Sequence, residues 1–261
     1  MGKTKIKPKK ALLILCLLIC ANTKAESVFS LDLKTDIIIN TLAIGVFTSS
    51  FFIENPPSQI PDSLTRSDVN SFDRFFMLTS QDTTIRRISD VTLACMYILP
   101  LIPAFSVMDN FNANILLTYS VMYAQTAMLA FGTERLIKNN VTRFRPFLHD
   151  GRALTFDDRN ESFPSGHTTM AFMSATFFAT AFSLEHPDSR WKWPLIIGSH
   201  SLAASVGTMR VVSGMHFVTD VLAGAVLGSL FGWVVPALHR NPNSNFSAIA
   251  TGNGLLLSLR F

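Results

Sequence analysis

The sequence predicts an all-α, membrane-embedded bundle of five to six helices, followed by a short C-terminal β-hairpin. Three observations lead to this fold class. Only 15% of the 261 residues are charged, against about 25% in soluble domains. The mean hydropathy is +0.32. The apolar residues gather in segments that approach the roughly 20 residues needed to cross a bilayer. The alternative is a soluble helical bundle with a large core, which the scarcity of charges within the segments disfavours.

The first 25 residues have the layout of a secretory signal peptide. An apolar core spans 11–21, and small residues lead to a cleavage point at Ala25. The alternative is an uncleaved N-terminal anchor. The basic region before the core holds five lysines: Lys3, Lys5, Lys7, Lys9 and Lys10. Because these lysines account for the net charge of +4, the basic balance does not indicate binding to nucleic acid.

The remaining elements follow from the pattern of apolar segments. We expect one helical membrane domain over residues 26–240 and a tail over residues 241–261, because no linker divides the chain. The tail has two apolar stretches around Gly252 and Gly254, which predict the hairpin. Residues 71–90 predict an amphipathic helix at the membrane interface. The six apolar segments are 37–54, 90–108, 113–137, 167–184, 194–209 and 217–238.

Three polar islands lie at the ends of these segments. They read "KNNVTRFRP" at 138–146, "PSGH" at 164–167 and "RVVSGMHFVTD" at 210–220. Taken singly, each has a structural interpretation as a head-group anchor, a helix cap or a hydrogen-bonded pair. Antiparallel helices, however, bring the ends of the third and fifth segments to the level where the fourth and sixth begin. The three islands are therefore expected to form one pocket.

Such a pocket suits phosphate. Arginine binds phosphate through paired hydrogen bonds and lysine binds it as a point charge. The N–H groups at the start of a helix add donors aligned with the helix dipole. His216 and Asp220 are four residues apart, so the carboxylate can reach the imidazole from the next turn. Histidine can act as a nucleophile. No cluster of carboxylates indicates a metal, and the three cysteines show neither a zinc spacing nor a disulfide framework.

The three islands resemble the tripartite motif of the type 2 phosphatidic acid phosphatase superfamily, in the form K-x6-RP, PSGH and R-x5-H-x3-D. The resemblance covers residues 138–220 in motif and about 90–238 in segment order. It implies a helical bundle whose pocket also binds vanadate in related haloperoxidases. It assigns the phosphate-binding positions to Lys138, Arg145, Ser165, Gly166 and Arg210.

The same resemblance gives roles to the other motif residues. It makes His216 the nucleophile, Asp220 its partner and His167 the general acid. One position departs from the family pattern, because Met209 stands where a serine usually precedes the motif arginine. One phosphate donor is then missing unless Thr208 or Ser213 compensates.

The resemblance implies a metal-independent lipid phosphatase that needs no cofactor and forms a phosphohistidine. The expected partners are the membrane and a phosphorylated lipid such as phosphatidate, phosphatidylglycerol phosphate, an isoprenyl diphosphate or lipid A. The residues indicate no oligomeric state. The alternatives are a vanadium haloperoxidase, a periplasmic acid phosphatase and an inactive membrane scaffold. We expect a bacterial-type inner membrane with the pocket facing the periplasm. A cleaved signal peptide with six full spans would instead turn the pocket inward, whereas segment 37–54 lying along the surface would restore the outward pocket.

Overall fold

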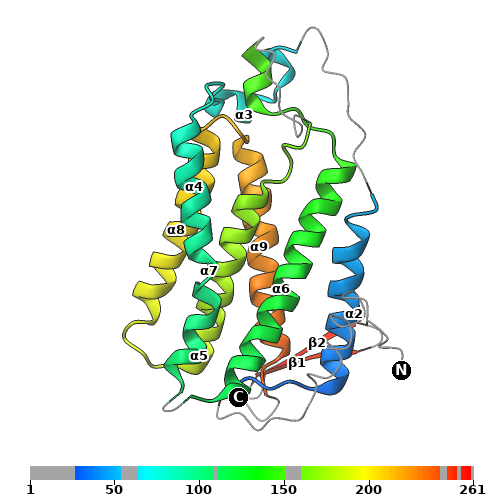
Figure 1. Ribbon diagram of the computed structural model, residues 1–261, viewed down its shortest axis with the longest axis vertical. Helices are drawn as coiled ribbons and strands as arrows, with labels where there is room; N and C mark the ends of the chain where they lie inside the picture. The colour runs from blue at the N-terminus through cyan, green and yellow to red at the C-terminus, as the bar shows by residue number, and fades with distance from the viewer. Residues whose placement is uncertain are drawn as a thin grey trace, which may run out of the picture.

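The computed structural model describes residues 27–53, 64–108, 111–150, 160–241, 246–251 and 254–259. Residues 1–26 lie outside this part, so the predicted signal peptide remains a prediction. The long helices run side by side as a bundle (Figure 1). They are α2 (Leu33–Ser49), α4 (Thr83–Met96), α6 (Ala113–Asn140), α7 (Gly166–Glu185), α8 (Lys192–Val212) and α9 (Val218–Leu238). The predicted helical bundle is confirmed.

Short elements complete the bundle. The 3-10 helix η2 (Leu99–Leu101) and α5 (Ile102–Ser106) extend α4 into a rod over Thr83–Ser106. The 3-10 helices η1 (Arg66–Asp68) and η3 (Pro146–Asp150) and the helix α3 (Ser71–Phe76) lie at the upper end in Figure 1. In the tail, β1 (Phe246–Thr251) and β2 (Gly254–Leu259) pair antiparallel as the predicted hairpin.

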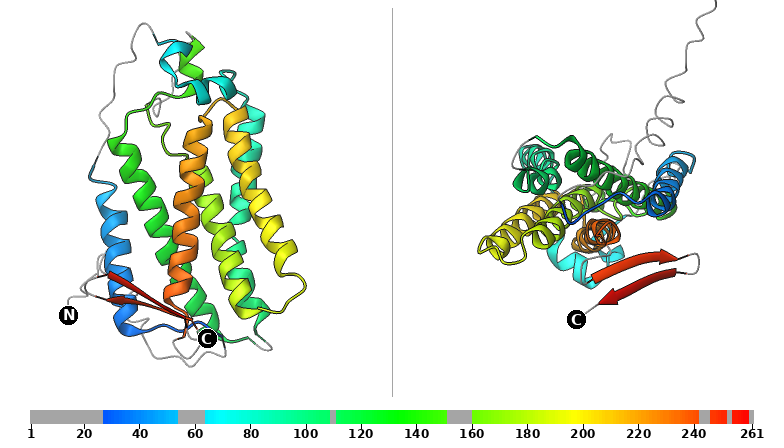
Figure 2. Two further views of the ribbon diagram at one scale, coloured as in Figure 1. Left: turned by 180° about the vertical axis from the view of Figure 1, so that it is seen from behind. Right: turned by 90° about the horizontal axis from the view of Figure 1, so that it is seen from below.

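Helix α7 is central, and it contacts α4, α6, α8 and α9. The view from below shows α2 at the edge of the bundle beside α6, away from α8 (Figure 2). Helix α2 packs along α6 from its middle to its end: Gln125 of α6 donates to Asp36 near the start of α2, and Asn139 donates to the carbonyl of Ser50 after the end of α2. The first apolar segment therefore stands upright in the bundle and does not lie along the membrane surface.

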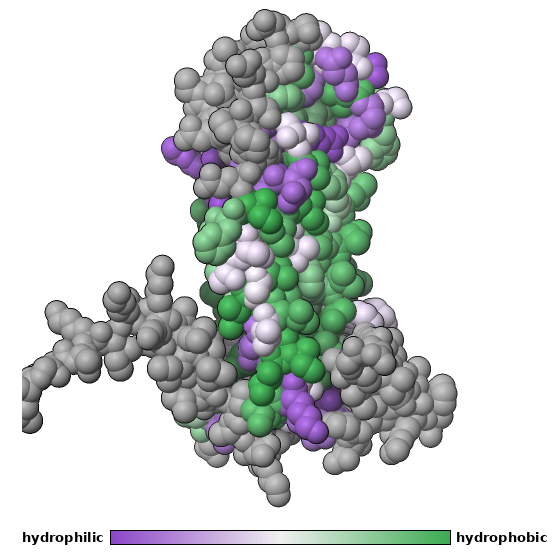
Figure 3. All heavy atoms as spheres, turned by 90° about the vertical axis from the view of Figure 1, so that its right-hand side faces the viewer, coloured by the Kyte–Doolittle hydropathy of each residue, from purple (hydrophilic) through white to green (hydrophobic). Residues whose placement is uncertain are grey.

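Within the part of the chain that the structure describes, four helical stretches are long and apolar enough to cross a membrane: Thr83–Ser106, Ala113–Asn140, Lys192–Val212 and Val218–Leu238. Their outward faces carry large apolar side chains, among them Val226 (71% exposed), Ile98 (64%) and Ile197 (63%). A side view of the bundle from its α2 edge shows apolar residues as a band along the middle, with polar residues towards the ends (Figure 3). Apolar exposure on this scale is typical of a surface that faces lipid. The protein is therefore a membrane protein.

Glycines bring α9 against the backbone of α7. A Cβ atom placed on Gly228 would lie 2.0 Å from the carbonyl oxygen of Thr169, and one on Gly224 would lie 2.7 Å from that of Ser165. Small residues repeated every four positions allow this close approach in membrane helices. The contact fixes the start of α7 beside the start of α9, which carry two of the three motifs.

One predicted element is wrong. Residues 71–90 do not form a continuous interfacial helix, because α3 ends at Phe76 and α4 starts at Thr83. Asp82 caps α4 by accepting hydrogen bonds from the N–H groups of Thr84 and Ile85. A carboxylate cap is a strong start signal for a helix, so the second half of this stretch belongs to the upper part of the α4 rod.

Candidate active site

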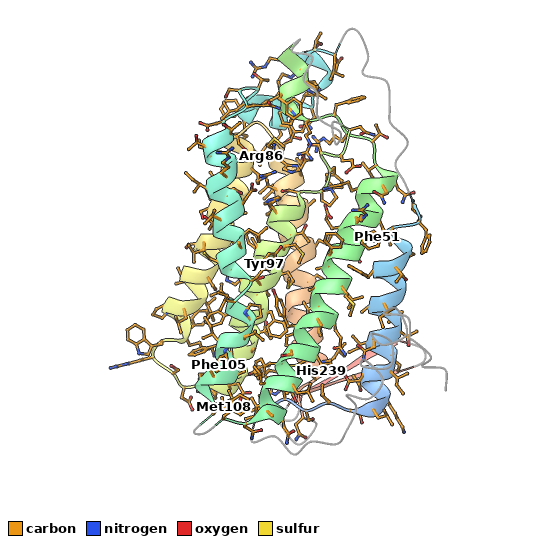
Figure 4. The ribbon with its side chains drawn as sticks, in the orientation of Figure 1. Phe51, Arg86, Tyr97, Phe105, Met108 and His239 are labelled. Carbon is orange, nitrogen blue, oxygen red and sulfur yellow. The ribbon has the colours of Figure 1, made fainter. Side chains whose placement is uncertain are left out.

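The three motifs meet at the upper end of the bundle in Figure 1. Helices α6 and α8 end there, and α7 and α9 begin there. Figure 4 labels Arg86 near this end of α4, whereas Tyr97 lies at mid-height and His239 at the opposite end. The convergence expected from antiparallel helices is therefore what the structure shows.

His216 lies in the tight turn between α8 and α9. Gly214 adopts a positive φ of 69°, which glycine accommodates without a Cβ penalty. The N–H groups of Met215 and His216 both donate to the carbonyl of Arg210, at 3.1 and 3.3 Å. The imidazole is buried, and its Nδ1 lies 2.7 Å from the carbonyl oxygen of Ser162. Because a carbonyl can only accept, Nδ1 carries the hydrogen and Nε2 has a free electron pair.

The surroundings keep His216 neutral. Burial lowers the pKa of His216 well below its ordinary value, and the charges of Arg145, Arg210 and Lys138 lower it further. The hydrogen bond to Ser162 opposes these effects without overcoming them. A neutral imidazole facing three cations is the form that a nucleophile towards phosphorus requires.

Asp220 lies close to His216 but is not its hydrogen-bond partner. Its Oδ2 is 3.7 Å from Nδ1 of His216, and it accepts from the hydroxyl of Ser162 at 2.6 Å and from the N–H of Phe217 at 2.8 Å. Its Oδ1 accepts from Arg143. Asp220 thus fixes the Ser162 segment, whose carbonyl in turn orients the imidazole.

The first motif reaches the pocket partly through a loop. Helix α6 ends at Asn140, so Lys138 and Arg145 do not share a helix face. Lys138 pairs with Glu134 one turn earlier, at 2.7 Å. Arg145 is buried, and its Nη1 lies 3.1 Å from the carbonyl of Met215 and 3.4 Å from Nε2 of His216. Arg145 therefore contacts the imidazole of His216, and the charge of Lys138 acts on that imidazole electrostatically.

The second motif forms the start of α7. Ser165 precedes the helix in an extended conformation, and its N–H donates to the carbonyl of Asp220 at 3.0 Å. Its buried hydroxyl accepts from Thr168 at 3.0 Å. The N–H groups of Gly166 and His167 have no acceptor within the helix. They are donors of the kind that bind anions at helix starts.

The third motif supplies Arg210, which is buried at the end of α8. The two hydroxyls expected to replace the missing serine at Met209 are engaged with backbone. Thr208 is exposed and donates to Ala204 at 2.9 Å, and Ser213 is buried and donates to the carbonyl of Arg210 at 3.2 Å.

Three residues at the site received no role from the sequence, although Arg143 lies in the first polar island. Asp90 of α4 contacts both His167 and Arg210. Arg143 donates to Asp220, and also to Asp73 at 2.6 Å and Thr219 at 2.8 Å. Asp73 is buried and accepts from Thr219. This network ties α3 to the start of α9.

A cavity of about 270 Å³ opens beside the site between α4, α6 and α7. Its polar lining includes Lys138, Glu161 and His167. Glu134 and Arg135 also line the cavity, and its apolar lining comprises Leu93, Tyr97, Phe131 and Met170. The cavity therefore joins the cationic end of the bundle to an apolar wall at the depth of the membrane helices. Among the described residues, no group of three or more His, Cys, Asp or Glu side chains is placed to hold a metal ion.

The fold and the site define a helical membrane protein in which histidine, arginine and lysine side chains from three motifs gather at one end of the bundle. Residues 115–244 match the family model of the PAP2 superfamily, and the chain belongs to that superfamily. The match contains all three motifs.

Two curated bacterial proteins are similar to this chain in sequence. The lipid A 1-phosphatase of Porphyromonas gingivalis is 33% identical over 127 residues, which are 47% of this chain and 25% of that protein. The phosphatidylglycerophosphatase B of Bacillus subtilis is 34% identical over 110 residues, 41% of this chain and 54% of that protein. The chain thus spans a quarter to about half of these relatives.

A solved structure also matches. It is described as the first transmembrane PAP2 type phosphatidylglycerolphosphate phosphatase from Bacillus subtilis. It is 22% identical and covers 87% of this chain and 92% of its own, with a TM-score of 0.41.

Proposed function

We propose that the protein is a metal-independent lipid phosphatase that hydrolyses a phosphate monoester or diphosphate through a phosphohistidine. The observation that carries this proposal is the state of His216. Its Nδ1 hydrogen is committed to Ser162, and Arg145 lies 3.4 Å from Nε2. An electron pair directed into a cradle of cations is the arrangement needed to attack a phosphorus atom.

The reaction has two steps. Nε2 of His216 forms a bond to phosphorus while the bond to the lipid oxygen breaks, and His167 gives its proton to that oxygen. Water then attacks the phosphohistidine and returns a proton to His167, which releases phosphate and restores both groups. Lys138, Arg145, Arg210 and the N–H groups at the start of α7 stabilise the charge on the phosphoryl oxygens. Asp220 acts through Ser162, which it holds by the 2.6 Å hydrogen bond.

The cavity supports a lipid as the substrate. A phosphate held by Lys138 and His167 places the neighbouring alkyl chains against Leu93 and Met170, which line the same cavity. The two relatives named above are called phosphatases of lipid A and of phosphatidylglycerophosphate. We therefore place the substrate among phosphorylated membrane lipids.

Phosphate release from a panel of lipids tests the proposal. Detergent-solubilised protein should release phosphate from at least one of phosphatidate, phosphatidylglycerol phosphate, an isoprenyl diphosphate and lipid A. We expect this activity to survive excess EDTA, because the described residues offer no cluster of metal ligands. Full loss on chelation, restored by magnesium, would contradict the histidine mechanism. Halide oxidation with vanadate and no phosphate release would favour a haloperoxidase.

We also propose that the protein lies in a bacterial-type inner membrane with the site on the periplasmic face. Ser30 donates to the carbonyl of His239, and Asn241 donates to that of Val28. The first described residues and the end of α9 therefore share one end of the bundle, opposite the site. If the site faces outward, the end of the bundle that holds residues 28–30 faces the cytoplasm. A signal peptide, by contrast, is removed on the outer side of the membrane. An outward site and removal of residues 1–25 are therefore incompatible.

Labelling decides the orientation. In a cysteine-free background, Ser67→Cys places a thiol on an exposed residue of η1 at the site end. A membrane-impermeant maleimide should label it from outside, and a reporter fused after Arg240 should report the cytoplasm. The opposite pair of results, together with a mature N-terminus at residue 26, would show an inward site and a cleaved signal peptide.

A further inference from the structure

Asp90 belongs to none of the three motifs, yet it touches two of them. It lies on the second turn of α4, 46% exposed. Its Oδ1 is 2.8 Å from Nε2 of His167 and 3.2 Å from Nη1 of Arg210. The carboxylate thus lies between the residue proposed as the proton donor and one of the cations proposed to bind phosphate.

The role proposed for His167 creates an electrostatic conflict. A general acid must carry its proton before the reaction. Burial has the largest effect on His167 and disfavours its imidazolium form, as do the charges of Arg210 and Lys138, whereas the contact with Asp90 favours that form. The cradle that binds phosphate therefore works against protonation of the donor.

The charged groups around His167 come from each neighbouring element. They are Asp90 of α4, Glu134, Arg135 and Lys138 of α6, Glu161 of the preceding loop and Arg210 of α8. From α9, Asp220 is engaged by Arg143 and Ser162. Glu134 is paired with Lys138. Asp90 is the carboxylate in hydrogen-bond contact with the imidazole.

We propose that Asp90 is the positioning residue that favours the protonated form of His167 and orients it as the proton donor. This inference rests on the proposed lipid phosphatase activity. In the imidazolium form both ring nitrogens carry hydrogen. Nε2–H donates to Asp90, and Nδ1–H, which has no partner among the described residues, is left for the leaving oxygen. As the P–O bond breaks, this proton passes to the departing alkoxide, and His167 becomes neutral until water returns a proton in the second step.

The test uses the variant Asp90→Asn, which keeps the shape and removes the charge. On a short-chain phosphatidate, whose leaving group is an alkoxide, kcat should fall about 10–100-fold. The basic limb of the pH profile of kcat should move to lower pH by about one unit, because less of His167 stays protonated. KM should stay constant or fall, since a negative charge near the phosphate has been removed. Turnover of p-nitrophenyl phosphate, whose leaving group needs no proton, should change much less.

Two further variants serve as controls. Asp90→Glu keeps the carboxylate and should retain the basic limb of the wild type. Asp188→Asn removes an exposed carboxylate from the turn after α7, at the other end of the bundle, and should behave as the wild type. Inhibition by inorganic phosphate, measured for every variant, reports whether the cradle is intact. If Asp90→Asn loses inhibition by phosphate, its cradle is disturbed, and the basic limb of Asp90→Glu then becomes the measurement that tests the role of Asp90.

The outcomes separate the inference from the proposed function. An unmoved basic limb in Asp90→Asn, with equal losses on both substrates, would overturn the role of Asp90 while the phosphatase activity stands. The role of Asp90 would also be overturned if the basic limb moved as far in Asp90→Glu as in Asp90→Asn. A wild-type protein that releases phosphate from no lipid would instead contradict the proposed function.

Discussion

Replacing His216 with alanine should abolish turnover of every substrate, whatever its leaving group. No covalent intermediate can form without the imidazole. We expect kcat to fall on the order of 10⁴–10⁶-fold, as when members of a nucleophilic unit are removed from other enzymes. Phosphate-release assays on phosphatidate and on p-nitrophenyl phosphate measure this loss.

Trapping the intermediate makes this test specific. Acid-labile, base-stable phosphate should attach to the wild-type chain during turnover and should be absent from His216→Ala. The matched control is His186→Ala, which removes an imidazole at the end of α7 opposite the site, where it contacts Ser106. It should retain both labelling and turnover. Turnover of His216→Ala comparable to that of the wild type would overturn the entire assignment.

The helices of the fold were largely predictable, since apolar composition over about 20 residues leaves few alternatives. Five of the predicted segments lie within elements of the rod Thr83–Ser106 and of α6 to α9, with shifts of a few residues at their ends. The ends depend on local caps such as Asp82 and Asn112, which accept from N–H groups at the starts of α4 and α6. The cap at Asp82 also explains why the single helix predicted over residues 71–90 was wrong. The amphipathic composition of this stretch gives no sign that α3 ends at Phe76 and that α4 starts at Thr83.

The convergence of the motif residues was predictable, because these residues have a fixed spacing at the ends of the apolar segments. The motif histidines, Lys138, Arg145 and Arg210 gather at one end of the bundle, and α9 positions Asp220 beside them. The partner of His216 was not predictable, because a backbone carbonyl such as that of Ser162 has no signature in the sequence. The residues that connect distant elements were not predictable either. Asp90 is 77 residues from His167 and 120 from Arg210. The one available signal for Asp90 was a charge at the first residue of the predicted segment 90–108.

Replacing His167 with alanine should reveal which chemical step needs a proton. An alkoxide is a strongly basic leaving group, and general acid catalysis is worth about 10²–10⁴-fold in such reactions. His167→Ala should therefore lose about that factor on phosphatidate. A nitrophenolate departs without a proton, so the loss on p-nitrophenyl phosphate should be much smaller, provided that formation of the phosphohistidine limits the rate.

The second step complicates the steady-state comparison, because water attack on the phosphohistidine also uses His167 to accept a proton. Single-turnover release of nitrophenol reports the first step alone and is the cleaner measurement. His200→Ala is a suitable control, since that imidazole bonds the carbonyl of Ile196 within α8 and contacts Thr176, away from the cradle. Equal losses on both substrates in single turnover would mean that His167 holds the phosphate and donates no proton. The 2.8 Å contact with Asp90 would then serve to orient an anion-binding imidazole, and the role proposed for Asp90 would fail with it.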